Sequence, residues 1–225
     1  MHKPRVSVII AVFNQERFIG RCLRSLLHQT ISHHEFEIIV VDDGSVDKTA
    51  YALNLFCDPA ESVVKVITNE VNLGLPASLN IGILSAKADL IVRVDSDDFV
   101  NTNFLNFLLS YMELNPTADA VACDYLLLND VEEVLERKNC LETPIACGIM
   151  FQKKHLLEIG LYDESFLRHE ERDLRLRFEK LYKISGLHIP LYRYRRHESN
   201  ITNDTTKMEL YREGLIKKHG KDVNN

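Results

Sequence analysis

Two patterns of apolar positions alternate along the first hundred residues. Short apolar runs of strand length are separated by stretches in which apolar residues recur every three or four positions. The runs predict four buried strands, at Val6–Val12, Glu35–Val41, Val63–Thr68 and Leu90–Val94. The stretches between them predict helices, the first of them over 18–27. Near-continuous apolar strands that alternate with helices favour an α/β fold, with a parallel sheet covered on both faces and right-handed crossovers.

The second half of the chain has a less regular pattern. Its periodicity predicts helices at Thr102–Asn115 and Lys153–Ile159, and an apolar stripe of Leu174, Phe178 and Leu181 on a charged helix. Strands are predicted at Ala118–Leu128, Val131–Leu135 and Leu191–Arg196, the first two joined by a turn at Asn129–Asp130.

The end of the chain is polar, and 207–219 predicts a final helix on the surface. We expect one domain over residues 1–203, with a nucleotide-binding half at 1–100 and a mixed half at 101–203. Residues 204–225 are expected to form a polar tail with a solvated helix.

Composition narrows the class of protein. The chain of 225 residues is 45% hydrophobic and has a formal net charge of −6, which argues against a broad nucleic-acid-binding face. Its longest apolar run, Val6–Phe13, is far shorter than the roughly 20 residues of a membrane span, and no leader pattern opens the sequence. We therefore expect a cytoplasmic protein. Peripheral membrane contact through the cations and apolar residues of 207–219 is an open alternative.

The cysteines agree with the expected cytoplasmic location. The five cysteines are an odd number and include no C-x-x-C pair. We expect reduced thiols, some of them filling the core.

Polar residues gather just after the predicted strands. Asn14 follows the first strand, Asp42 and Asp43 the second, Asn69 and Asn72 the third, and Asp95, Asp97 and Asp98 the fourth. In open α/β sheets the carboxyl ends of the strands form the binding crevice. Four such clusters on successive strands predict a site.

The triple-acid loop at Asp95–Asp98 suggests a metal. Three carboxylates within four residues repel one another, and all-oxygen ligands select Mg²⁺ or Mn²⁺ bound together with substrate phosphates. A solvated turn before the next helix is the alternative. The Asp42–Ser45 segment has the residues of an ordinary turn, and its functional interpretation is a carboxylate that accepts a hydrogen bond from a nucleobase.

Two further segments combine charges. His169–Asp173 opens the charged helix, where the helix dipole favours an ionised carboxylate that can serve as a general base; plain helix-start chemistry is the alternative. The segment Tyr192–His197 has a high density of cations. These cations could bind phosphates, and a solvated surface is the alternative interpretation. No G-x-G-x-x-G or Walker A motif follows the first strand, so dinucleotide and P-loop chemistries lose their main support.

Taken in order, these segments resemble the family 2 glycosyltransferases, which have the GT-A fold. The resemblance covers about residues 5–203. Its carrying segments are Val6–Asn14, Ser25–Thr30, Ile39–Ser45, Asn72–Gly74, Asp95–Asp98, Glu170–Arg177 and Tyr194–His197.

The resemblance implies an inverting transfer of sugar from a nucleotide-sugar, with a UDP-sugar favoured, to an acceptor hydroxyl in glycan or cell-envelope polysaccharide synthesis. The acceptor would be a glycan, a lipid-linked molecule or a protein, and Mg²⁺ or Mn²⁺ the cofactor. The residues that match the family's positions are, for catalysis, Glu171; for the donor, Ala11, Phe13, Asn14, Asp43, Asp95 and Asp97; for the metal, Asp97, Asp98 and His197; and in secondary roles, Asp42, Glu170 and Arg196.

Two departures from the family pattern stand out. The acidic pair is Glu170–Glu171 where Glu-Asp is more usual, so the base would be one methylene longer. The helix after Gly74 lacks the Arg that many members place before Asn80.

Two other functions remain as alternatives. A catalytically silent nucleotide-sugar-binding domain would keep the same fold. A haloacid-dehalogenase-type phosphatase would use Asp95-Ser-Asp97 as a nucleophile motif, although that chemistry places its motif after the first strand.

Overall fold

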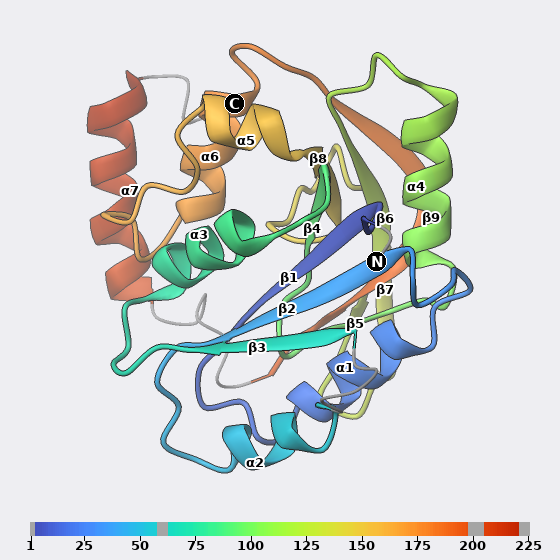
Figure 1. The fold of residues 1–225 in the computed structure, drawn as a ribbon. Helices are drawn as coiled ribbons and strands as arrows, with labels where there is room; N and C mark the ends of the chain where they lie inside the picture. Colours follow the sequence, from blue (N-terminus) through green and yellow to red (C-terminus); the bar gives the residue numbers. More distant parts are fainter. Residues whose placement is uncertain (1–2, 58–62, 198–204, 221–225) are drawn as a thin grey trace.

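A single mixed sheet forms the centre of the protein (Figure 1). The computed structural model describes residues 3–57, 63–197 and 205–220. Within them the strand order is β3-β2-β1-β4-β8-β6-β9-β5, and β7 pairs with β6. The strands are β1 Val6–Val12, β2 Phe36–Asp42, β3 Val64–Thr68, β4 Leu90–Arg93, β5 Phe99–Val100, β6 Ala120–Leu128, β7 Val134–Lys138, β8 Ile149–Gln152 and β9 Ile184–Arg195.

The strands β1 to β4 are all parallel: β1 lies between β2 and β4, and β3 pairs with β2. The second half joins this unit through β8, which is antiparallel to both β4 and β6. The carboxyl ends of β1, β2 and β4 therefore meet at one edge of the sheet, as the sequence predicts.

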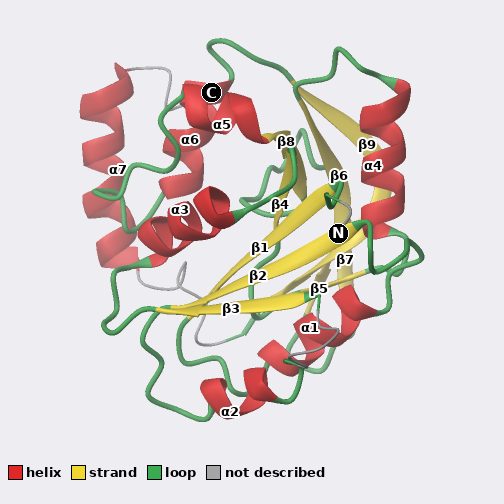
Figure 2. Cartoon of the chain, viewed as in Figure 1, coloured by secondary structure: helices red, strands yellow, loops and turns green. Residues whose placement is uncertain are grey.

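Helices cover both faces of the sheet (Figure 2). One face carries α1 Ile19–Leu27, α2 Thr49–Asn54 and α4 Phe104–Leu114; the other carries α3 Leu75–Ser85, α5 Lys153–Glu158 and α6 Glu170–Phe178. The final helix, α7 Thr205–His219, lies beside α6 (Figure 1). Alternation along β1 supplies both layers, because Val8 and Ile10 pack with α1 while Ile9 packs with α3.

Each layer has its own apolar core. Leu23, Leu26 and Phe104 are buried on the α1 side, and Leu79, Leu174 and Phe178 on the α3 side. The five cysteines are unpaired with one another, and four of them are buried, so some cysteines fill the core as expected. Among the described helices, none is both long enough and apolar enough to cross a membrane.

Several predicted elements need correction. Leu181 is exposed beyond the end of α6, so the predicted stripe ends at Phe178. The hairpin turn after β6 is present, but β7 begins at Val134 rather than Val131. The last strand starts at Ile184, seven residues before the predicted start, and β5 and β8 were not predicted.

The predicted final helix is present as α7, and most of its described residues are exposed, as expected for a surface helix. It is not solvated on every side, however. Leu215 of α7 is completely buried against Phe166. A helix that buries an apolar residue in this way is part of the folded unit rather than a free tail.

Candidate functional site

A cavity of about 290 Å³ opens at the carboxyl ends of β1, β2 and β4. The structure brings most of the predicted residues to it, from segments more than 150 positions apart. The predicted residues that line it are Ala11, Phe13, Asp43, Asp95, Asp97, Asp98, Glu170 and Glu171. We call this space the donor cavity.

Asp95 and Asp97 present carboxylates to the donor cavity from the loop after β4. The Asp95 carboxylate accepts a hydrogen bond from Arg93 Nε at 2.6 Å, and Asp97 Oδ2 lies 2.9 Å from His197 Nε2. Both acids keep part of their surface accessible, with side-chain exposures of 25% and 19%. This oxygen donor set fits Mg²⁺ or Mn²⁺, which bind through one or two carboxylates together with substrate phosphates.

Asp98 differs from its two neighbours because it is buried beneath the loop. Its carboxylate accepts hydrogen bonds from Tyr192 Oη at 2.8 Å and from the Arg195 backbone N–H at 2.7 Å. Burial, followed by the charges of Asp97 and Asp95, raises its pKa well above the usual range. These contacts fix the acidic loop to β9.

Cys147 lies beside the same loop. Its Sγ and one oxygen each from Asp95 and Asp98 are within 4.8 Å of one another. Burial, together with the charges of Asp95 and Asp98, raises the pKa of the Cys147 thiol well above its usual value. The protonated thiol is a weak donor, 3.8 Å from Asp98 Oδ2, rather than an anionic ligand.

Arg93 is a site residue that the sequence analysis missed. It lies at the end of β4, with a side chain only 7% exposed, and its Nη1 is 3.2 Å from Glu170 Oε1 while its Nε binds Asp95. One guanidinium thus ties the acidic loop to α6. The available signal was a single charged residue within the apolar run Leu90–Val94, two positions before Asp95.

The two glutamates that begin α6 have different surroundings. Glu170 is buried against Arg93, and burial, followed by the charge of Glu171, raises its pKa to about 7. Glu171, about 100° further round the helix, is partly exposed and lines the donor cavity. His169 precedes them with a left-handed backbone, φ 60°, which turns the chain into the helix.

A second cavity, of about 440 Å³, runs along α6. Its wall is largely apolar and includes Ile149, Phe151 and Leu174. It shares Glu171, His169 and residues 144–146 with the donor cavity. Glu171 therefore lies where the two cavities meet, whereas Glu170 lines only the first.

Asp43 holds the loop that follows β3. Its two carboxylate oxygens accept hydrogen bonds from the backbone N–H of Leu73 and of Gly74 and from Asn69 Nδ2, at 2.8–2.9 Å. Gly74 has φ +94°, and a Cβ there would lie 2.7 Å from the Leu167 side chain. The carboxylate still borders the donor cavity, so it both shapes and lines this end of the site.

Four predicted residues do not line the donor cavity. Asn14, with φ 52°, accepts a hydrogen bond from the Val46 N–H, and Asp42 accepts one from the Ser45 N–H. His197 is buried behind Asp97, with its ring centroid 4.7 Å from that of Phe18. Arg196 is exposed, and its backbone N–H binds the Leu128 carbonyl.

Comparison with known proteins identifies the family. The glycosyl transferase family 2 profile matches residues 7–155, about two thirds of the chain. An uncharacterised glycosyltransferase of Haemophilus influenzae is 33% identical, over 61% of this chain and 39% of its own length. A Bacillus subtilis protein named "Putative glycosyltransferase EpsH" is 28% identical, over 96% of this chain and 67% of its own length.

Solved structures show the same fold. S. aureus TarS in complex with UDP-GlcNAc superimposes with a TM-score of 0.77 at 20% identity, over 94% of this chain and 66% of that one. The mannosyltransferase PcManGT of Pyrobaculum calidifontis, in complex with GDP-Man and Mn²⁺, superimposes with a TM-score of 0.75 at 16% sequence identity. The match covers 96% of this chain and 65% of that one. The chain thus spans about two thirds of each. With a profile match over most of its length and this architecture, the chain belongs to glycosyl transferase family 2 and has the GT-A fold.

Proposed function

We propose that this chain is a metal-dependent, inverting glycosyltransferase that transfers a sugar from a UDP-sugar to an acceptor hydroxyl. The observation that carries the proposal is the position of Glu171, a carboxylate where an acid-lined cavity meets a largely apolar one. Family membership, and the nucleotide-sugars bound by TarS and PcManGT, support a nucleotide-sugar donor.

The donor cavity would hold the nucleotide-sugar. Asp43 would accept a hydrogen bond from a nucleobase N–H, and Asp95 would face the ribose and diphosphate. Asp97, supported by His197, would hold Mg²⁺ or Mn²⁺, with Asp98 fixing the loop beneath it. When bound, such an ion neutralises negative charge on the diphosphate.

Glu171 would act as the general base. The acceptor oxygen would attack C1 of the sugar from the side opposite the diphosphate, forming the new C1–O bond as the bond to the diphosphate oxygen breaks. The acceptor proton would pass to a Glu171 oxygen and the bonding electrons would leave with the nucleoside diphosphate. Attack from the opposite side inverts the anomeric carbon. Holding both reactants in adjoining cavities supplies the orientation that the reaction requires.

Glu170 is less suited to this role. It is bound to Arg93 and lines only the donor cavity, so it would orient α6 rather than meet the acceptor. The acceptor, whether a glycan, a lipid-linked molecule or a protein, would occupy the cavity along α6. We propose a place in glycan or cell-envelope polysaccharide synthesis, at the cytoplasmic side of the membrane.

Release of free UDP tests the proposal. The protein, with Mn²⁺, is incubated with UDP-glucose, UDP-galactose, UDP-N-acetylglucosamine and GDP-mannose, with and without excess EDTA. We expect UDP release from at least one UDP-sugar that stops in EDTA and in Asp97→Asn, while the exposed control Glu213→Gln keeps full activity. Tight UDP binding without turnover would instead indicate a silent binding domain, and full turnover in EDTA would remove the metal from the proposal.

A further inference from the structure

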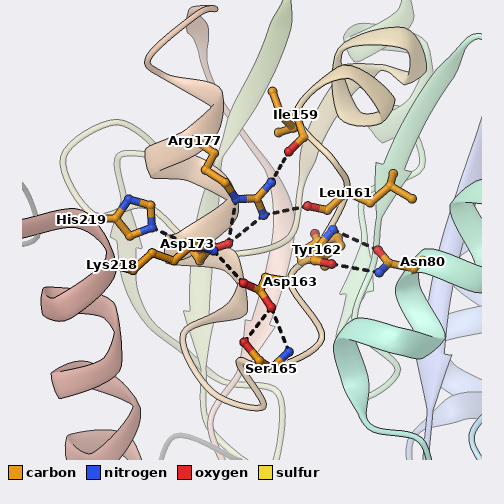
Figure 3. A network of polar contacts seen from close by, with 10 residues as sticks. All are labelled: Asn80, Ile159, Leu161, Tyr162, Asp163, Ser165, Asp173, Arg177, Lys218 and His219. Atoms are coloured by element: carbon orange, nitrogen blue, oxygen red, sulfur yellow. Dashed lines mark hydrogen bonds and ion pairs between the residues drawn. The ribbon is translucent and has the colours of Figure 1, made fainter.

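A polar network surrounds residues of α6 that line neither the donor cavity nor the cavity along α6 (Figure 3). Its centre is Asp173, which is completely buried two residues after Glu171. Two residues correspond to about 200° around a helix, so the two carboxylates face nearly opposite ways. Asp173 is therefore placed to hold the helix that carries Glu171 without approaching the reacting groups.

Asp173 has three cationic or hydrogen-bonding partners. Its Oδ2 lies 2.7 Å from Arg177 Nη2, and its Oδ1 lies 2.6 Å from Lys218 Nζ and 2.7 Å from His219 Nε2. Burial by itself would raise the pKa of Asp173, but the hydrogen bonds from Lys218, His219 and Arg177 outweigh burial and lower the pKa. The buried Asp173 carboxylate is thus ionised, and both of its oxygens have partners.

The partners of Asp173 reach other parts of the chain. Arg177 also donates to the carbonyls of Ile159 and Leu161, at 2.6 and 2.7 Å, in the segment that leads toward α6. Lys218 also binds Asp163 Oδ2 at 2.7 Å, and its Nζ lies 5.1 Å from the centre of the Phe166 ring. The network therefore joins α6 to the preceding segment and to α7.

Two more contacts complete the frame around α6. Asn80 of α3 exchanges two hydrogen bonds with the backbone of Tyr162, at 2.9 and 3.0 Å (Figure 3). Leu215 of α7 is fully buried against Phe166. The segment 159–169, which leads directly into Glu170 and Glu171, is thus held from α3 on one side and from α7 on the other.

α6 needs such support because of its length and sequence. It has only nine residues, Glu170–Phe178. Isolated helices shorter than about 12–15 residues are marginal in water. Six of the nine residues are charged, so apolar packing supplies only part of the anchoring.

We infer that α7 is a positioning element for the general base. Lys218 and His219, acting through Asp173, fix the rotation of α6 about its axis and its position along that axis, so that Glu171 stays where the two cavities meet. This inference rests on the proposed function and adds to it the residues that orient the base. Lys218, His219 and Asp173 line neither the donor cavity nor the cavity along α6, so they are positioning residues. A displacement of about 1 Å at a reacting group can lower a rate by up to about 10²-fold.

The test separates turnover from donor binding. Lys218→Met, His219→Gln and the rescue variant Lys218→Arg are compared with Lys217→Met, a control at an exposed neighbouring lysine of α7. Each full-length protein is assayed with Mn²⁺ for hydrolysis of the UDP-sugar that the wild type turns over fastest. The Kd for UDP is measured by titration calorimetry, and the Tm by scanning calorimetry.

We expect Lys218→Met and His219→Gln to lower kcat about 10- to 100-fold while the Kd for UDP stays within about twofold. Lys218→Arg, which keeps the charge, returns most of the rate, and Lys217→Met matches the wild type. A lower Tm with unchanged kcat would overturn the inference in favour of a purely structural helix. Equal losses of kcat and UDP affinity would also overturn it, since the disturbance would then extend to the donor cavity.

Glu171→Gln, assayed in parallel, distinguishes failure of this inference from failure of the proposed function. If Glu171→Gln is inactive and Lys218→Met matches Lys217→Met, the base assignment stands and the positioning role of α7 falls. If Glu171→Gln hydrolyses the donor normally, the assignment of Glu171 as the base is wrong, and the proposed role of α7 in positioning that base is then wrong as well.

Discussion

Replacing Glu170 with Gln should change how stability depends on pH. Gln has nearly the same shape but no titratable proton. The pKa of Glu170 rises from 4.5 to about 7 in the folded protein, because burial and the charge of Glu171 outweigh the attraction of Arg93. The folded protein therefore binds the Glu170 proton more tightly than the unfolded chain does. The stability supplied by the protonated carboxyl is complete below about pH 4.5 and is lost as the pH rises through about 7.

The size of this effect follows from the shift. One pKa unit corresponds to about 1.4 kcal/mol, so a rise from 4.5 to about 7 corresponds to about 3 kcal/mol. Urea unfolding, followed by circular dichroism in EDTA, gives the free energy of unfolding of both proteins from about pH 4.5 to about pH 8. We expect Glu170→Gln to gain about 3 kcal/mol relative to the wild type over this range. Parallel curves for the two proteins would refute the reasoning, because Glu170 would then titrate alike in the folded and unfolded states.

Three further predictions concern the donor cavity. Asp97→Ala should abolish sugar transfer while the circular dichroism spectrum stays unchanged, since the side chain is partly accessible; transfer at the wild-type rate would contradict its role. Asp43→Ala should weaken UDP binding by roughly 1.5–3 kcal/mol, the range for a hydrogen bond to a charged group, as measured by titration calorimetry. Tighter wild-type binding of GDP-sugars than of UDP-sugars would contradict the base-pocket assignment. Arg93→Met should lower the free energy of unfolding by about 3–5 kcal/mol in urea, because Asp95 and Glu170 lose their buried partner; a loss below about 1 kcal/mol would mean that their pairing is dispensable.

The sequence predicted the parallel half of the fold well, and for a physical reason. A strand buried on both faces must be apolar throughout, so β1, β2 and β4 stand out as runs, and the acids after them fall at one edge. Strands such as β8, with four residues, and the segment Ile184–Pro190 of β9, which includes Gly186, leave no such pattern. Their places in the sheet depend on neighbours distant in the chain.

The site was predictable to a similar degree. Position after a strand pointed to the groups Asp42–Asp43 and Asp95–Asp98, and the family resemblance then selected Asp43, Asp95 and Asp97 within them. All three line the donor cavity. Local pattern cannot reveal that Asp98 is buried by Tyr192, or that Lys218 reaches Asp173 from 45 residues away, because both depend on tertiary contacts. The burial of Leu215 in the polar final helix was missed for the same reason, because it depends on the distant residue Phe166.

The central claim is that Glu171 is the general base. The most direct measurement is kcat for Glu171→Gln and Glu171→Asp, with the Kd for UDP determined on the same protein samples. We expect a fall in kcat of about 10²–10⁴-fold for Glu171→Gln with little change in UDP affinity, since a general base would contact the acceptor hydroxyl rather than UDP. Glu171→Asp should restore part of the rate. An inactive Glu170→Gln beside a fully active Glu171→Gln would place the base one residue earlier, and normal turnover by both would contradict the assignment altogether.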